Sequence, residues 1–503
     1  MNAEGITDPS PSAAFLRDAA QRGDFRALKE RRTRIVATIG PASSGPETLK
    51  AMAAAGLDVA RVSFSHGSID EAIARIRAIR EAIPGIAILA DLPGPKVRAT
   101  PFGEHGAALE ENQELDLAIA ALAPASDATC IGVELEQGFS ELEVGDRIIF
   151  GDGGVVLTVL NPGNDRIRVK VTTSGTLHGK PGVTVPSKSM SLSAPTPEDL
   201  ERVKALVAEE VEAIAISFVR FPEDVVKVRE ACGHLPCQLM AKIETQEAID
   251  NLEEIVKVSD AVMVARGDLG VRMPIEEIPS LQKRIIRAGI RYAKPVVTAT
   301  QMLESMIHAT TPTRAEVTDV ANAVFDGTSA VMLSAETAIG ENPALVVETM
   351  ARVLHRAEQD FPYLEWGASL GVQQVSGDRA SALRITAAIS GAAWRAAIEE
   401  GAAAIIACSA SGTTVRSICR FRPAIPIVAV TANDYRARQL RTSWGVSKVL
   451  IDSSENERQL ADTAMSYLRS EGKVRVGDVV VVLAGSRHTS SPVTDTVRLI
   501  RVE

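Results

Sequence analysis

Residues 239–268 read LMAKIETQEAIDNLEEIVKVSDAVMVARGD, and this stretch decides the fold. Two short apolar runs, Leu239–Ile243 and Ala261–Val264, lie on either side of a polar segment of helix-forming composition. A buried strand, a helix and a second buried strand in this order form the repeating unit of a parallel sheet. An acidic residue follows each run, Glu244 directly after the first and Asp268 four residues after the end of the second. The stretch therefore predicts both a sheet and polar side chains at its edge.

The same pattern recurs along the chain. Six further apolar runs lie at Ile35–Ile39, Val59–Phe64, Ile86–Ala90, Ala213–Phe218, Pro295–Ala299 and Ala330–Leu333. Most runs are separated by helical stretches rich in Ala, Glu and Arg, so we expect an α/β fold in which eight parallel strands close into a (β/α)₈ TIM barrel. Two helix starts support this register, because Thr196 and Thr313 each place a capping hydroxyl three residues before a carboxylate, that of Asp199 or Glu316.

The barrel is one of several expected units. Short strand-like runs such as Val155–Leu160, with turns such as Asn161-Pro162-Gly163, predict a small all-β barrel inserted as a lid. Beyond the last barrel strand, strands and helices alternate again and predict a doubly wound α/β domain of effector type. The expected units are an N-terminal helical arm, the barrel in two parts, the inserted domain and the C-terminal domain, at residues 1–33, 34–95 with 191–361, 96–190 and 362–503.

Composition limits the class of protein. The 503 residues suffice for about three domains. The net charge of −10, without a basic run, makes nucleic acid an unexpected partner. The start of the chain lacks the pattern of a signal peptide, and no apolar run is long enough to span a bilayer, so no membrane partner is expected. The five scattered cysteines indicate reduced thiols, and we therefore expect a cytoplasmic enzyme.

Polar residues gather where the predicted strands end. In strand order they are Arg61, Ser63, Ser65, Asp91, Ser217, Lys242, Glu244, Arg266, Asp268, Thr300, Ser334 and Glu336. In a barrel of this kind the carboxyl ends of the strands carry the active site. A single residue of this kind would be read as a strand cap, but so many on one face would leave buried charge unpaired if nothing bound there.

Lys242 and Glu244 form the centre of this group. They are two residues apart, so a strand directs both to the same side. Glu244 and Asp268 on neighbouring strands can offer carboxylate oxygens to one hard cation, and Mg²⁺ prefers one or two carboxylates with substrate oxygens and water. The alternative is a Lys242–Glu244 ion pair that only fills space. Gly267 makes this alternative weaker, because glycine lets backbone N–H groups approach an anion.

Arg61 indicates the chemistry of the substrate. A guanidinium binds phosphate or carboxylate through two hydrogen bonds, although an arginine at a strand end is as often part of a structural ion pair. Beside Lys242 and a metal site, a phosphoryl ligand is the better interpretation, because phosphoryl transfer depends on positioned cations more than on a strong nucleophile.

Several segments resemble one known family, the pyruvate kinases. The segments are Leu239–Thr245, Met263–Gly270, Ala299–Met306, Pro312–Glu316 and Val331–Ser334, and the similarity extends from Arg34 to the end of the chain. The resemblance implies transfer of the phosphoryl group of phosphoenolpyruvate to ADP, giving pyruvate and ATP in the last step of glycolysis. It also implies Mg²⁺, with Mn²⁺ as a substitute, and a homotetramer.

The resemblance assigns a role to each site residue. Glu244 and Asp268 would bind the metal ion, and Lys242 would stabilise the phosphoryl group in transfer and the enolate that remains. Arg61 would hold the phosphate, and Gly267 and Asp268 backbone groups with Thr300 would hold the carboxylate. Water near Thr300 and Ser334 would protonate the enolate. The nucleotide side would be formed by Ser63, His66, Arg98 and Lys180.

Departures from the family pattern concern the monovalent cation. Ser63-Phe64-Ser65 has a serine where many relatives that need K⁺ have an asparagine, and Lys96 stands where those relatives have a glutamate. Since an ammonium group supplies one positive charge on a tether, Lys96 could replace K⁺ near Ser63, Ser65 and Asp91. We therefore expect activity without K⁺. The alternative is that Lys96 is a solvated hinge residue.

Two other departures have no assigned consequence at this stage. Ser329 stands where an aspartate is usual in the family, and Ala335 where a glycine is usual.

The C-terminal domain contains a loop that is a candidate for an effector site. Residues Ser409, Ser411, Gly412, Thr413 and Thr414 lie between a predicted strand and a predicted helix, where hydroxyl and N–H groups form a phosphate nest or an ordinary helix cap. The resemblance implies a phosphorylated effector here, with Arg487 as a further contact. The sequence does not decide between the two.

Two other functions are alternatives to phosphoryl transfer. An aldolase or carboxylase would keep the barrel and the Mg²⁺–enolate chemistry, but it has no need of a nucleotide side with Arg98. A catalytically silent sensor would usually lose a metal ligand first, whereas Glu244 and Asp268 are both present.

Overall fold

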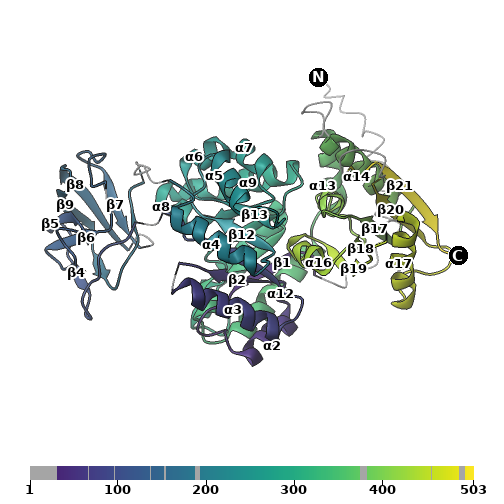
Figure 1. Ribbon diagram of the computed structural model, residues 1–503, viewed down its shortest axis with the longest axis horizontal. Coiled ribbons are helices and arrows are strands. Elements are labelled where there is room, and N and C mark those ends of the chain that lie inside the picture. Colours follow the sequence, from purple (N-terminus) through teal and green to yellow (C-terminus); the bar gives the residue numbers. More distant parts are fainter. Residues whose placement is uncertain are drawn as a thin grey trace, which may run out of the picture.

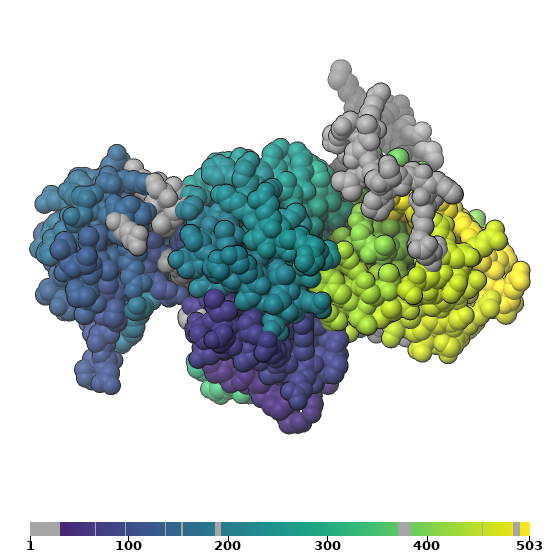
Figure 2. All heavy atoms as spheres, viewed as in Figure 1, coloured from purple at the N-terminus to yellow at the C-terminus, as the bar shows by residue number. Residues whose placement is uncertain are grey.

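Three units lie in a row along the molecule, with the barrel in the middle (Figure 1). The computed structural model describes residues 31–65, 67–95, 97–135, 137–151, 154–186, 193–373, 382–454, 456–485 and 493–503. The helix expected before residue 31 lies outside these residues. In the space-filling view, the C-terminal domain has broad contact with the barrel, whereas the inserted domain forms a separate lobe (Figure 2).

Eight parallel strands close into a barrel, which confirms the predicted fold class. The strands are β1 (Arg34–Thr38), β2 (Val59–Ser63), β3 (Ala87–Asp91), β12 (Ala213–Ile216), β13 (Gln238–Ile243), β14 (Ala261–Ala265), β15 (Val296–Ala299) and β16 (Ala330–Leu333). Strand ends differ from the predicted runs for local reasons. Phe218 lies outside β12 because its φ is +55°, and Pro295 lacks the N–H that a strand residue donates.

Helices surround the barrel. They are α2 (Pro46–Ala55), α3 (Ile69–Ala82), α4 (Pro197–Ala208), α5 (Pro222–Ala231), α6 (Gln246–Asp250), α7 (Leu252–Val258), α8 (Arg266–Arg272), α9 (Ile278–Arg291), α10 (Arg314–Asp326), α11 (Ala335–Ala338) and α12 (Pro343–Gln359), with 3₁₀ turns η1 (Ile275–Glu277) and η2 (Glu304–Ile307). Both predicted capping boxes are present, since the hydroxyls of Thr196 and Thr313 accept hydrogen bonds from the N–H groups of Asp199 and Glu316.

Alternation along each strand places the site. One set of side chains, including Leu89, Ala215 and Met240, packs inside the barrel, while the neighbouring set packs against the helices. Because side chains alternate between the two sides of a strand, the residue two positions further on points to the same interior. Asp91, Ser217 and Lys242 are those residues, and they are therefore expected at the mouth of the barrel.

The inserted domain is all-β. It contains β4 (Ala107–Leu109), β5 (Glu114–Ile119), β6 (Cys130–Val133), β7 (Arg147–Phe150), β8 (Val155–Asn161), β9 (Arg166–Thr173), β10 (Gly175–Leu177) and β11 (Val183–Thr184). Six of these strands form one sheet in the order β11-β7-β8-β9-β5-β6, and β10 pairs with β4. A separate apolar core that includes Phe150 and Leu157 holds the domain together.

The C-terminal domain is a five-stranded sheet in the order β19-β18-β17-β20-β21, with helices on both faces (Figure 1). Its elements are α13 (Tyr363–Gln373), α14 (Ala382–Glu399), β17 (Ala404–Cys408), α15 (Thr413–Cys419), β18 (Ile427–Thr431), α16 (Asp434–Gln439), η3 (Leu440–Thr442), β19 (Val446–Ile451), α17 (Glu457–Ser470), β20 (Val479–Ala484) and β21 (Thr496–Arg501). Separate apolar clusters lie on the two faces, which confirms the doubly wound prediction. The antiparallel strand β21 was not predicted.

The described helices include none that could cross a membrane. All five cysteines are free thiols, and the Sγ atoms of Cys232 and Cys237 lie 3.3 Å apart.

Candidate active site

Lys242 lies at the centre of the barrel mouth, where β13 ends. Its Nζ is 2.7 Å from the Ser217 hydroxyl, 2.9 Å from Oε1 of Glu244 and 3.3 Å from Oδ1 of Asp91. Burial alone would lower the pKa of the ammonium group, but the charges of Asp91, Glu244 and Asp268 outweigh burial and raise the pKa above its usual value. Lys242 is therefore a permanently charged and fixed cation.

Asp91 joins Lys242 to Arg61. Its Oδ2 accepts a hydrogen bond of 2.7 Å from Nε of Arg61, and Nη1 of Arg61 donates to the hydroxyl of Thr38 at 2.8 Å. Burial would raise the pKa of Asp91, but the positive charges of Lys242 and Arg61 prevail and hold it below the usual range. Two cations are thus positioned by one buried carboxylate, which leaves one edge of the Arg61 guanidinium for a ligand.

Glu244 is fully buried, and its two oxygens differ. Oε2 accepts a hydrogen bond of 2.7 Å from the N–H of Phe218. Oε1 is close enough to Lys242 for an ion pair, but within the described part of the chain it accepts no hydrogen bond of good geometry. We regard the contact as electrostatic, since its direction is poor, and Oε1 keeps a lone pair for another ligand.

The carboxylates fit a divalent cation. Burial and the nearby charge of Asp268 raise the pKa of Glu244 to about 7, against the opposing effect of Lys242. Asp268 follows β14 in the first turn of α8. A buried carboxylate whose ionisation a second carboxylate disfavours suits Mg²⁺, which takes one or two carboxylates and completes its shell with water and substrate. Within the described residues there is no larger cluster of His, Cys, Asp and Glu at metal-binding distance.

Thr300 lies beside the first turn of α8 in a strained conformation. Its φ is +71°, which a β-branched residue rarely adopts. Arg266 supports this conformation, because it donates 2.7 Å hydrogen bonds to both oxygens of Asp319 and one of 2.6 Å to the carbonyl of Thr300. Strain that is supported in this way is typical of functional sites.

Gly267 is joined to Thr300 through its backbone. Its N–H donates to the Thr300 hydroxyl at 2.8 Å, and the approach of backbone groups here to an anion stays a prediction. A Cβ atom at Gly267 would lie 3.5 Å from Oγ1 of Thr300, which is ordinary contact.

Ser334 and Glu336 end the eighth strand. The buried carboxylate of Glu336 accepts hydrogen bonds from the N–H groups of Ser334 at 2.6 Å and Leu303 at 3.1 Å. Glu336 therefore fixes the loop that carries Ser334.

The residues expected around the monovalent cation are only partly described. The hydroxyl of Ser63 accepts a hydrogen bond of 3.3 Å from the N–H of Ser65, and the carbonyl of Asp91 accepts one of 3.0 Å from the N–H of Phe64. Lys96 and His66 lie outside the described residues.

Arg98 and Lys180 lie together on the inserted domain. Nη1 of Arg98 donates to the carbonyl of Lys180 at 3.2 Å, and Nζ of Lys180 is 2.7 Å from Oε1 of Glu134. Among the described residues, no hydrogen bond or ion pair joins either side chain to Lys242 or Glu244.

The candidate effector loop closes on itself. The hydroxyl of Ser409 accepts a hydrogen bond from the N–H of Gly412 at 2.9 Å, and the hydroxyls of Ser411 and Thr413 are 3.0 Å apart. Thr414 pairs with Thr494 of a distant segment at 2.7 Å. The helix α15 that follows begins after Gly412 without a side-chain cap, so these bonds lie within the loop. Arg487 lies outside the described residues.

Sequence reasoning missed two features of the site. The first is the role of Asp91 as a bridge between two cations, which depends on the register of β2, β3 and β13 in space. The second is Arg272, whose pKa is lowered by burial although Glu244 and Asp268 oppose this effect. Its position four residues after Asp268 on α8 could have indicated it, because such residues share a helix face.

Comparison with known proteins gives one consistent result. The family model described as "Pyruvate kinase, barrel domain" matches residues 30–347, and the one described as "Pyruvate kinase, alpha/beta domain" matches residues 387–500. The pyruvate kinase of Bacillus licheniformis is 40% identical over 91% of this chain and 78% of its own. That of Clostridium acetobutylicum is 35% identical over 94% of this chain and 100% of its own. That of Methylorubrum extorquens is 38% identical over 94% and 97%.

Proposed function

Because the chain belongs to the pyruvate kinase family and is a phosphotransferase, we propose that it transfers the phosphoryl group of phosphoenolpyruvate to ADP. The observation that carries this proposal is the fixed pair of cations at the barrel mouth. Arg61 and Lys242 both contact Asp91, at 2.7 and 3.3 Å. The two positive charges are therefore held close together at the barrel mouth, where they can bind an anionic phosphoryl group. Positioned cations are what a migrating phosphoryl group requires.

The proposed roles follow from the contacts. Arg61 binds the phosphate of the substrate through its free edge, and Lys242 neutralises charge on the group in transfer and on the enolate oxygen. Thr300, held by Arg266, and the backbone of Gly267 and Asp268 at the start of α8 would bind the carboxylate of the substrate, as the resemblance implies. The enolate takes a proton at its carbon from water near Thr300 and Ser334, so phosphoenolpyruvate, ADP and one proton give pyruvate and ATP.

Mg²⁺ is part of the proposal. Glu244 and Asp268 would hold it, with Mn²⁺ as a substitute, and a bound cation would neutralise phosphate charge during transfer. What supports this is the Oε1 atom of Glu244, buried and without a hydrogen bond among the described residues. Arg272 adds positive charge behind both carboxylates. Ser63, His66, Arg98 and Lys180 remain the proposed nucleotide side.

The proposal includes activity without K⁺. Asp91, the register partner of Ser63 on the neighbouring strand β3, already neutralises Arg61 and Lys242. It therefore offers little uncompensated negative charge to a further cation. Lys96 would supply the charge that K⁺ supplies in other members.

Family resemblance also supports a homotetramer, a cytoplasmic location and a phosphorylated effector at residues 409–414. The first of these is tested by sedimentation of the purified chain. The effector is tested by the response of activity to sugar phosphates in the wild type and in Thr413→Ala.

The main proposal is tested by a direct assay. Purified protein is incubated with phosphoenolpyruvate, ADP and Mg²⁺, and ATP and pyruvate are measured independently. We expect equal amounts of both products, and none after chelation of the metal ion. Pyruvate without ATP would indicate a phosphatase, and neither product would contradict the proposal.

A further inference from the structure

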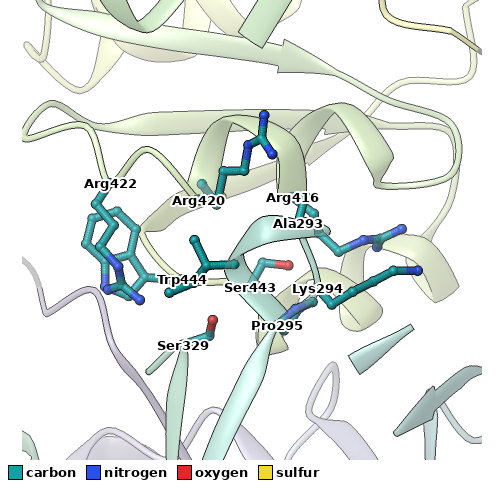
Figure 3. A pocket seen from close by; sticks show the side chains of 11 residues that line it. Ala293, Lys294, Pro295, Ser329, Arg416, Arg420, Arg422, Ser443 and Trp444 are labelled. Atoms are coloured by element: carbon teal, nitrogen blue, oxygen red, sulfur yellow. The ribbon is translucent and has the colours of Figure 1, made fainter. Parts of the chain in front are cut away.

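A pocket lies between the barrel and the C-terminal domain, at the end of the barrel opposite to the active site. Pro295 and Ser329, on its wall, directly precede β15 and β16, so the pocket is at the amino ends of these strands. Its volume is about 320 Å³, mouth included. Arg422 and Trp444 lie on one side of it, and Lys294 and Arg416 extend on the other (Figure 3).

The wall of this pocket is cationic. Its lining includes Lys294, Arg416, Arg420 and Arg422 and no carboxylate. Within the described chain, none of the four takes part in an ion pair. The negative charge of Asp260 acts on the pKa values of both Lys294 and Arg416. Asp260 is already bound, however, to Arg229 at 2.9 Å and to the N–H of Leu239 at 3.0 Å. The pocket therefore has excess positive charge.

Several hydrogen-bond donors in this wall have no acceptor among the described residues. They are Nε and Nη2 of Arg420, Nη1 of Arg422, Nε1 of Trp444 and the hydroxyl of Ser443, all shielded from bulk solvent. Buried donors are normally bonded, and a buried charge without a partner destabilises a protein by several kcal/mol. A bound hydrogen-bond acceptor would satisfy these donors, and the described residues do not provide one.

Arg422 is held in place for such a ligand. The side chain is 2% exposed, Nη2 donates to the carbonyls of Gly327 and Thr328, and the guanidinium lies 4.6 Å from the ring centroid of Trp444. Burial lowers the pKa of Arg422 to about 10, with partial opposition from Tyr363 and Glu358, and lowers that of Arg420 to about 10 without opposition. Both groups remain charged near neutral pH.

We propose that this pocket between the two domains binds a small oxyanion, a phosphate or carboxylate group, through Arg420, Arg422, Ser443 and Trp444. Because its 320 Å³ includes solvent at the open mouth, the pocket suits a compact group and not a nucleotide. The anion would lie at the boundary of the two domains, because Pro295 and Ser329 on the pocket wall belong to the barrel and the four binding residues belong to the C-terminal domain. It would also act on the loop at 409–414, since Nη2 of Arg416 donates to the carbonyl of Ser411 at 3.1 Å.

Ser329 provides a sharp test of this proposal. Its hydroxyl lies at the pocket wall in Figure 3, where it accepts a hydrogen bond from the N–H of Val296 at 3.2 Å, and the two carbonyls bound by Arg422 belong to the residues just before it. A carboxylate at this position would face the guanidinium. Ser329→Asp is therefore expected to supply an internal anion, to raise the unfolding temperature in anion-free buffer, and to abolish the response to added anion.

The experiment measures thermal unfolding and tryptophan fluorescence of the full chain in inorganic phosphate, acetate and chloride at equal ionic strength. For the wild type we expect phosphate or acetate, but not chloride, to raise the unfolding temperature by roughly 1 °C at several times the dissociation constant. The stronger of the two identifies phosphate or carboxylate as the ligand group. Arg420→Met should weaken the response at least about tenfold, because it removes charge-assisted hydrogen bonds.

Two controls exclude the other anion sites. Lys242→Met reports on phosphate in the active site, and Ser409→Ala on phosphate at the C-terminal loop, so the response must persist in both. Loss of the response in Lys242→Met or Ser409→Ala with retention in Arg420→Met would overturn the proposal. A wild-type response in Ser329→Asp, or equal effects of chloride and phosphate, would do the same. None of these outcomes depends on the proposed catalytic activity.

Discussion

The active site at one end of the barrel and the pocket at the other end hold buried cations in different ways. At the carboxyl end, Arg61 and Lys242 are neutralised by Asp91 and Glu244 at distances of 2.7 to 3.3 Å. At the amino end, Arg420 and Arg422 are packed against aromatic rings and backbone carbonyls, without a carboxylate in contact within the described chain. The ion pairs of the active site hold its cations in place whether or not substrate is bound. The cations of the pocket have no such pairs, so their stability depends on a bound anion in the proposal above.

The largest effect is expected from Lys242→Met, which breaks the network at its centre. Removal of a positioned charge that acts on the transition state costs about 10²- to 10³-fold in kcat. The measurement is ATP formation from phosphoenolpyruvate and ADP at saturating Mg²⁺. The matched control is Lys204→Met, an exposed lysine of α4 paired with Glu201, which should leave kcat unchanged. Undiminished turnover in Lys242→Met would remove the role given to this residue.

Asp91→Asn removes the shared carboxylate but leaves both cations. Arg61 and Lys242 then repel each other in a buried site, so we expect a loss of about 3 kcal/mol in the free energy of unfolding. Denaturant titration measures this loss. Asp360→Asn, which breaks an exposed pair with Arg356, is the control and should cost less than about 1 kcal/mol. Equal effects of the two variants would show that Asp91 does not carry the network.

Asp58, at the amino end of the barrel, neutralises two cations, as Asp91 does in the active site. It therefore provides a second carboxylate on which the effect of neutralisation can be measured. Its carboxylate accepts hydrogen bonds from Arg31 at 2.8 Å, from Arg34 at 3.0 Å and from the N–H of Ile35 at 2.9 Å. Burial would raise the pKa of Asp58, but the charges of Arg31 and Arg34 prevail and lower it. A lowered pKa means that the contribution to stability is complete above the unfolded value of about 3.9 and is lost as the pH falls through the folded value.

Asp58→Asn should therefore flatten the acid limb of the stability profile, measured by unfolding between neutral pH and the acid range. The same substitution should lower stability near neutral pH by about 2 to 3 kcal/mol, since Arg31 and Arg34 lose their partner. A variant that keeps the full acid dependence of the wild type would show that another carboxyl group is responsible.

Much of the barrel was predictable because local pattern decides it. Runs such as Ala261–Val264 are buried on both faces, so their composition alone indicates a strand, and the caps at Thr196 and Thr313 follow from adjacent residues. Short strands such as β10 and the half-exposed edge strand β21 lack this pattern, because their pairing comes from neighbours distant in sequence.

The site was predictable to a similar extent. Period-two alternation places Lys242 and Glu244 on one side, and their contact agrees with it. The bridge from Asp91 to Arg61 and Lys242 depends on how three strands meet in space, which no local pattern shows. The cationic pocket was also not predicted, because Arg422 and Ser329 come from different domains. Ser329 departs from the family pattern, but only the structure shows that it lines the same pocket as Arg422.

The smallest effect is expected from K⁺. Equal activity with and without K⁺ would show that the charges of the active site are balanced by groups of the chain. If Asp91 is already neutralised by Arg61 and Lys242, and Lys96 supplies the further charge, K⁺ has no role at the carboxyl end. Initial rates with and without K⁺, in a buffer with a tetraalkylammonium counterion, should not differ for the wild type. Lys96→Glu should restore a requirement for K⁺, because it replaces the tethered cation by an anion. Full activity of the wild type only with K⁺ would mean that the network around Asp91 still needs a cation from solution.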